Sequence, residues 1–155
     1  LRRVEGADDG FDATLADDWL ALLHAGGVDF TLAWRRLADT AAGDEAPLRT
    51  LFGDAVAPDA WLDRWRERCA REDDEGGGGG AARIQRMKRV SPWVIPRNHR
   101  VEEALAAASD EGDVGPFERL LAAVRRPYDE DPENARFAEP AGADVTALYR
   151  TFCGT

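Results

Sequence analysis

The residues of this chain that could carry chemistry are few and far apart. Its two histidines, His24 and His99, have no second histidine or cysteine at the spacing that metal ligands need. The five glycines at 76–80 follow an acidic run and lack the lysine and hydroxyl that a phosphate-binding loop places just beyond its glycines. Paired carboxylates lie in hydrophilic stretches, where nothing is expected to raise the pKa of one carboxyl above that of its neighbour, as acid–base catalysis requires. The sequence therefore predicts no catalytic, cofactor-binding or metal-binding residue in this chain.

A basic island between residues 83 and 100 contrasts with an overall net charge of −10. It contains Arg83, Arg86, Lys88, Arg89, Arg97 and Arg100. One interpretation is pairing with the acidic residues that flank the island within the chain. The other is that Arg97 and Arg100 dock onto an acidic or phosphate-bearing surface elsewhere in a larger protein. The residues alone leave both interpretations open.

Composition excludes several classes of partner. The acidic charge opposes binding to nucleic acid and to anionic membrane surfaces, and no apolar run approaches the roughly 20 residues that cross a bilayer. Cys69 and Cys153 form no CxxC pair, so we expect a reducing compartment. The chain starts at Leu1 without methionine or signal peptide, as expected of a piece of a longer protein.

Apolar spacing predicts an all-α fold of short helices in antiparallel pairs, with no strand of useful length. Asp12 or Thr14 is expected to cap the first helix, Asp29 or Thr31 the second, and Asn98 a later one. The expected helical segments are 15–23, 30–37, 48–52, 58–71, 81–89, 98–108 and 117–124. Asp113 is expected to cap the last of these, which would form an αα-hairpin with the segment before it.

The expected organisation is one domain in two helical halves. Residues 1–71 form the N-terminal half, residues 72–80 an acidic, glycine-rich flexible loop, and residues 81–155 the C-terminal half with the hairpin and a tail. Between Pro92 and Pro96 an apolar Trp-Val-Ile stretch should form an extended plug. The proline-rich segment 127–142 has no helical period and should be extended.

Several segments, in order, resemble the C-terminal part of the selenoprotein O (YdiU) family. The main one runs from Met87 to Asn98 and reads Met-Lys-Arg-Val-Ser-Pro-Trp-Val-Ile-Pro-Arg-Asn. Downstream, Phe-Glu-Arg-Leu-Leu at 117–121 and Arg-Pro-Tyr-Asp-Glu at 126–130 keep the family's order and spacing. Upstream segments also match, so the resemblance covers nearly the whole chain. Ser91, Pro96, His99 and the glycine insertion depart from the usual pattern.

The resemblance implies the C-terminal portion of a protein-kinase-like fold. The family transfers AMP from ATP to Ser, Thr or Tyr hydroxyls of proteins, using Mg²⁺ or Mn²⁺. These functions belong to an upstream domain, so no catalytic, ATP-binding or metal-binding residue carries over and this chain alone is expected not to be an enzyme. Its implied partners are that kinase-like domain and the protein substrates. The implied compartment is the cytoplasm in a bacterium or the mitochondrion in a eukaryote.

One position carries over from the family, namely the terminal cysteine, Cys153. The resemblance implies that this thiol can form a redox-sensitive disulfide with a cysteine of the kinase-like domain. The alternative is an exposed thiol of low reactivity, since only Arg150 offers a nearby cation. The alternative for the whole chain is a stand-alone helical protein-interaction module, for which a start codon at or near Leu1 is expected.

Overall fold

The protein is helical throughout the part of the chain that the structure describes. The computed structural model describes residues 9–54, 56–76 and 78–142, and no strand occurs among them. The chain divides into two compact units, Leu1–Ser91 and Pro92–Thr155. The predicted all-α class is confirmed.

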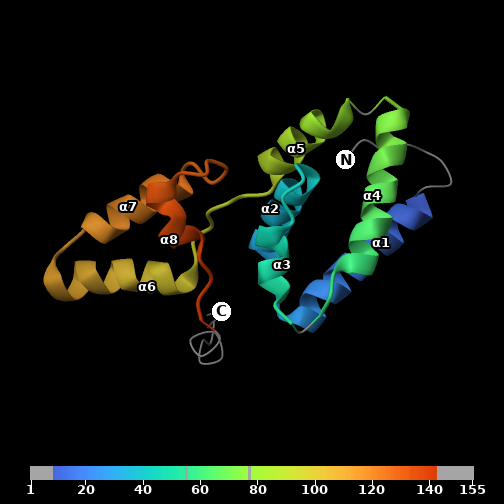
Figure 1. The fold of residues 1–155 in the computed structure, drawn as a ribbon. Coiled ribbons are helices and arrows are strands. Elements are labelled where there is room, and N and C mark those ends of the chain that lie inside the picture. The colour runs from blue at the N-terminus through green and yellow to red at the C-terminus, as the bar shows by residue number, and fades with distance from the viewer. Residues whose placement is uncertain (1–8, 55, 77, 143–155) are drawn as a thin grey trace. The chain divides into compact units, whose positions relative to one another are not determined.

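The N-terminal unit contains five α-helices (Figure 1). They are α1 (Asp9–Gly26), α2 (Phe30–Ala41), α3 (Ala46–Phe52), α4 (Asp59–Asp74) and α5 (Gly79–Val90). Helix α2 packs against α3 and α5, whereas α1 packs mainly against α4. The expected antiparallel pairing of helices does not join α1 to α2, the next helix in the sequence. The main partner of α1 is instead α4, which carries two tryptophans on its apolar face.

The capping residues of the first two helices were only partly predictable. Helix α1 begins before both expected caps, and Thr14 Oγ1 donates a hydrogen bond to the Gly10 carbonyl at 2.9 Å inside the helix. Asp12 is also inside it, and its Oδ1 accepts a hydrogen bond from Arg68 Nε of α4 at 2.6 Å. For α2 the prediction is confirmed, because Asp29 Oδ1 accepts from the Leu32 amide at 2.8 Å.

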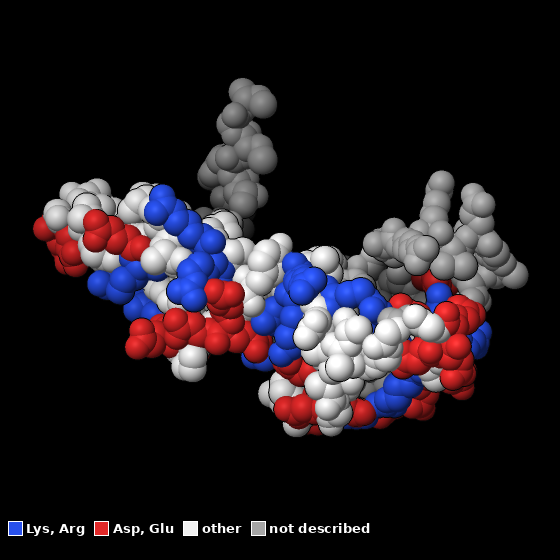
Figure 2. All heavy atoms as spheres, turned by 90° about the horizontal axis from the view of Figure 1, so that it is seen from above, with Lys and Arg blue, Asp and Glu red and all other residues white. Residues whose placement is uncertain are grey.

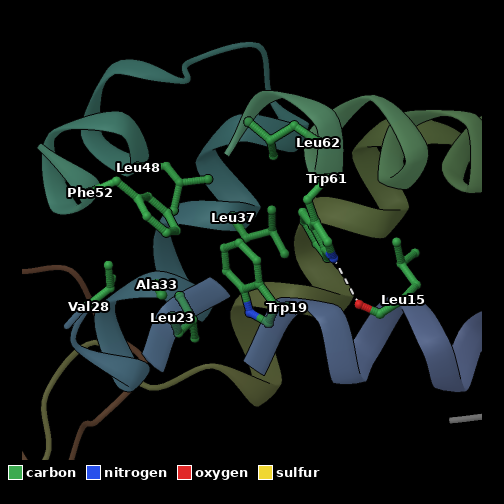
Figure 3. Close-up of a cluster of buried hydrophobic side chains, with 10 residues drawn as sticks. All are labelled: Leu15, Trp19, Leu23, Val28, Ala33, Leu37, Leu48, Phe52, Trp61 and Leu62. Atoms are coloured by element: carbon green, nitrogen blue, oxygen red, sulfur yellow. Dashed lines mark hydrogen bonds between the residues drawn. The ribbon is translucent and has the colours of Figure 1, made fainter. Parts of the chain in front are cut away.

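Trp19 of α1 is the centre of the hydrophobic core of the N-terminal unit, and its side chain is fully buried (Figure 3). Its ring lies 4.3 Å from that of Trp61, 6.0 Å from Phe52 and 5.9 Å from Trp34, measured between centroids. Trp61 Nε1 donates to the Leu15 carbonyl at 2.8 Å, which satisfies the buried indole (Figure 3). Four helices thus meet on a single aromatic cluster.

Helices extend into the expected loop at 72–80 from both ends. Helix α4 continues to Asp74 and α5 begins at Gly79, and Gly76 and Gly78 turn the chain with φ of 88° and 85°. Left-handed φ values suit glycine, which has no side chain to clash. Gly76 and Gly78 therefore lie between two helices, Gly79 and Gly80 belong to α5, and the chain divides into units between Ser91 and Pro92 rather than here.

Arg83 of α5 holds the end of α4 close to α5 at that turn. Its Nη2 atom donates both to the Cys69 carbonyl and to Asp73 Oδ1, each at 2.6 Å, and the side chain is nearly buried. Acidic residues near the end of α4 thus bind a cation from α5. This ion pairing offsets the glycine-rich composition from which a flexible loop was predicted.

The C-terminal unit is built on the predicted αα-hairpin. Helix α6 (Asn98–Ala106) continues into a π-helical turn (Ala107–Glu111), and α7 (Gly115–Val124) returns antiparallel beside it (Figure 1). Gly112 has a φ of 70° at the turn between them. A short 3-10 turn (Pro132–Asn134) and α8 (Ala135–Ala138) follow.

Three details of this unit differ from the sequence-based expectations. Asn98 is the first residue of α6 rather than its cap, which is Arg97. Asp113 does bind the start of α7, accepting from the Gly115 amide at 2.8 Å, although Val114 occupies the N-cap position. Segment 127–142 was expected to be extended without helix, but it contains the 3-10 turn and α8.

The predicted apolar plug lies in the core of this unit. Trp93 and Val94 are almost fully buried, and both of their amides donate to the Pro127 carbonyl, at 2.7 and 3.1 Å. The other buried members of this core are Ala104, Leu120, Ala123, Phe137 and Ala138. Phe137 is buried against this apolar cluster. This tertiary contact stabilises the four-residue helix α8, although the local sequence shows no helical periodicity.

Candidate functional site

The first part of the basic island lies on α5 and is paired within the N-terminal unit. Arg86 Nη2 lies 3.0 Å from Glu72 Oε1, and Lys88 Nζ lies 2.9 Å from Asp39 Oδ1. Together with Arg83, these side chains follow the first interpretation, pairing with acidic residues of the same chain. Figure 2 shows basic and acidic side chains adjoining one another over the visible face.

A buried cation that the sequence did not reveal binds the end of the same helix. Arg35 of α2 is only 2% exposed, and its Nη1 donates to the carbonyls of Lys88 and Ser91 at 2.9 and 3.0 Å. The last carbonyls of a helix have no partner within it, and a guanidinium has enough donors to bind several of them. Arg35 lies among apolar residues of α2, and nothing in the local pattern distinguishes it from the neighbouring, only partly buried Arg36.

Arg97, one of the two predicted docking residues, is nearly buried in the C-terminal unit. Its Nε atom donates to the Ala138 carbonyl at 3.0 Å. Arg97 also precedes the first turn of α6. It therefore connects the start of α6 to the last residue of α8.

Arg100, the other predicted docking residue, is also bound within this unit. Its Nε donates to the Arg136 carbonyl at 3.1 Å, its Nη1 lies 2.9 Å from Glu103 Oε1, and its Nη2 lies 3.6 Å from Glu139 Oε2. The structure thus gives both arginines internal contacts in the helical unit. Docking of Arg97 and Arg100 on another surface stays a prediction.

His99 lies between these arginines and lines a shallow pocket with Arg100, Glu102 and Pro140. Burial lowers the pKa of His99, and the positive charge of Arg100 lowers it further. The Nε2 atom is buried and has no hydrogen-bond partner within the described residues. The arrangement favours neutral imidazole, although the charge of Glu103 acts in the opposite direction.

Of the two cysteines, Cys69 lies among the residues that the structure describes. Cys69 is partly buried near the end of α4, and burial raises the pKa of its thiol although the nearby Arg83 opposes the shift. A raised pKa disfavours the reactive thiolate form of Cys69. Cys153 lies outside the described residues, as does the whole tail from residue 143.

No group of three or more His, Cys, Asp or Glu side chains among the described residues could hold a metal ion. No helix in the described part of the chain has the length and apolarity needed to span a membrane. The structure instead brings arginines and Lys88 together with carboxylates, and several arginines with backbone carbonyls, which is an arrangement that holds helices in place.

The chain is similar to bacterial proteins named protein nucleotidyltransferase YdiU. It is 49% identical over 152 residues to the protein of Chromobacterium violaceum, 47% identical over 152 residues to that of Cereibacter sphaeroides, and 42% identical over 144 residues to that of Agrobacterium fabrum. These alignments cover 98%, 98% and 93% of this chain. No protein-family profile matches it.

The chain spans less than a third of each of these relatives, namely 31%, 29% and 28% of their lengths. The matching part is the C-terminal part of the relatives. Identity above 40% over nearly the whole chain agrees with the motif at 87–98, at the α5–α6 connection, and with the motif at 117–130, which begins on α7 and continues past its end. This chain therefore belongs to the YdiU (selenoprotein O) family of protein nucleotidyltransferases and corresponds to its C-terminal part.

Proposed function

We propose that this chain is the non-catalytic helical segment of a protein adenylyltransferase. The parent protein would transfer AMP from ATP to Ser, Thr or Tyr hydroxyls of other proteins. The observation that carries the proposal is the identity of 42–49% to the C-terminal part of proteins named nucleotidyltransferases. ATP, the Mg²⁺ or Mn²⁺ ion and the protein substrates would bind an upstream kinase-like domain, which would be the main partner of this segment.

The contacts of the described charged residues support a structural role for the segment. Arg35 and Arg97 are buried and bind backbone carbonyls, and Arg83 binds a carbonyl and a carboxylate at a helix junction. A catalytic group instead needs access to a substrate and a protonation state suited to its task. Burial and the neighbouring arginines lower the pKa of His99, which favours its neutral form.

We also propose that Cys153 regulates the parent protein through a disulfide with a cysteine of the kinase-like domain. Oxidation would join the tail covalently to that domain, and reduction would release it. Mass spectrometry of the full-length protein after mild oxidation, without reductant, should find a peptide containing Cys153 linked to an upstream cysteine. Finding Cys153 always as a free thiol under these conditions would exclude this mode of regulation.

The non-catalytic role is tested by incubating the 155-residue chain with labelled ATP, Mg²⁺ or Mn²⁺ and a mixture of candidate protein substrates. We expect no transfer of label to protein, while the full-length Chromobacterium violaceum relative serves as the positive control. Transfer of AMP by the purified chain, at any rate that scales with its concentration, would refute the proposal.

A further inference from the structure

A small pocket in the C-terminal unit is lined by an excess of positive charge. It lies among α6, α7 and α8, which Figure 1 shows together, and has a volume of about 130 Å³. Each helix contributes one arginine, namely Arg100, Arg119 and Arg136, whereas Glu103 is the one carboxylate residue in the lining. In a chain of net charge −10, three guanidinium groups facing one carboxylate form a local exception.

Glu103 shows how the pocket holds a negatively charged group. Its Oε1 lies 2.9 Å from Arg100 Nη1, and its Oε2 lies 3.3 Å from Arg136 Nη2. A carboxylate from α6 is therefore bound between arginines of α6 and α8. Guanidinium groups bind phosphate oxygens with the same donor geometry that they use for carboxylates.

Arg119 is the cation of this set with no ion pair among the described residues. Its side chain is exposed and folds back over the first turn of α7, where Nη1 lies 3.2 Å from the position that a β-carbon on Gly115 would take. Pro116 of the same turn lines the pocket. The start of a helix carries partial positive charge, but here Asp113 Oδ1 lies 3.0 Å from the same position and accepts from the Gly115 amide, so the Arg119 guanidinium is the main attraction for an anion.

Other carboxylates near the pocket already have partners. Asp113 Oδ1 accepts from the Gly115 amide at 2.8 Å, and Glu139 lies 3.6 Å from Arg100. Glu103 and Glu139 together offset the charge of two of the three arginines, since both carboxylates lie within ion-pair distance of them. The positive charge that remains for an incoming group is that of Arg119.

We propose that this pocket binds a single phosphate group, held by Arg119 and Arg136 beside the Arg100–Glu103 pair. Its volume of about 130 Å³ lies below the range of about 300–1,000 Å³ that holds whole drug-sized ligands. The ligand is therefore inorganic phosphate or the phosphate group of a larger molecule that extends into solvent. This site goes beyond the proposed AMP transfer and requires only the residues of this chain.

Calorimetric titration of the 155-residue chain at low ionic strength tests the site, because added salt screens exposed charges. The probes are inorganic phosphate, AMP and O-phosphoserine. We expect saturable 1:1 binding of inorganic phosphate, weakened about tenfold by Arg119→Gln, since a charged hydrogen bond contributes about that factor. Any order of affinity among the three probes supports the site. The probe that binds most tightly identifies whether the preferred phosphate is free or esterified.

Two further variants separate a specific site from general attraction of anions. Glu103→Gln should strengthen phosphate binding, because it removes the carboxylate that competes for Arg100 and Arg136. Arg125→Gln is the matched control, since Arg125 is an exposed arginine at the other end of α7 and should leave affinity unchanged. Arg119→Lys, which keeps the charge but loses the two-pronged donor, should bind with intermediate affinity.

The proposal is overturned if the unmodified chain shows no saturable binding. It is also overturned if Arg125→Gln weakens binding as much as Arg119→Gln, or if Glu103→Gln fails to strengthen it. Circular dichroism of each variant checks that the helices are intact. Neither result depends on transfer of AMP, so a failure of this site and a failure of the proposed function are distinguishable.

Discussion

Arg35→Ala should destabilise the N-terminal unit far more than the same change at its neighbour Arg36. The buried Arg35 guanidinium donates to the carbonyls of Lys88 and Ser91. Hydrogen bonds from a charged donor contribute about 1.5–3 kcal/mol each, so losing two costs at least about 3 kcal/mol. With a slope of about 2 kcal/mol per molar urea, the unfolding midpoint should fall by about 1.5 M.

Arg36→Ala is the matched control because Arg36 forms a partly exposed ion pair with Asp39, at 3.0 Å. Such pairs contribute at most about 1 kcal/mol. Urea unfolding followed by tryptophan fluorescence reports both variants, since Trp19 lies in the core of this unit. Hydrogen exchange should also accelerate in α5 of Arg35→Ala. Equal midpoints for the two variants, with unchanged exchange in α5, would refute the reasoning.

Three further predictions follow from single contacts. Trp61→Phe removes the hydrogen bond to Leu15 and should lower the free energy of unfolding by about 1–2 kcal/mol, measured by urea titration. Cys69 should react slowly with a thiol reagent at pH 8 in the folded chain and quickly in urea, because burial raises its pKa; equal rates would contradict this. The folded pKa of His99 is lowered, so its contribution to stability is present above the unfolded value of about 6.5 and is lost as pH falls below it. The free energy of unfolding of His99→Gln should therefore fall less between pH 7 and pH 5 than that of the unmodified chain. An equal fall in the two proteins would refute a lowered pKa of His99 in the folded state.

The sequence predicted those parts of the fold that depend on local pattern. The apolar spacing around Trp19 and Trp61 indicated amphipathic helices, and the Gly112 turn indicated the hairpin of α6 and α7. Asp29 was predictable as a cap because its carboxylate acts on an amide three residues away. Such features need no information about distant segments.

Features that depend on contacts between distant segments were missed. The glycine-rich stretch was expected to be a flexible loop, but Arg83 binds Asp73 across it and the flanking helices extend. Helix α8 has no local period and forms where Phe137 enters the second core. The burial of Arg35 depends on which face of α2 meets α5, and a single sequence does not specify this.

The sequence identified arginines of the C-terminal unit by residue type, but it did not indicate the contacts that they make. Arg97 and Arg100 were singled out for their charge, whereas the structure binds them to carbonyls and carboxylates of their own unit. Arg119 had no distinguishing signal, since its place in the arginine-lined pocket requires α6, α7 and α8 to come together. The terminal Cys153, which carries the proposed regulation, lies outside the described residues.

The most direct test of the central claim is an exchange of segments with a relative. The C-terminal part of the Chromobacterium violaceum protein that aligns with this chain, over 152 residues, would be deleted or replaced by this chain. AMP transfer from labelled ATP to protein is then measured for the intact, deleted and exchanged forms. The account predicts that the exchanged protein transfers AMP and that this chain alone does not. Transfer by the chain alone, or a folded exchanged protein no more active than the deleted form, would contradict it.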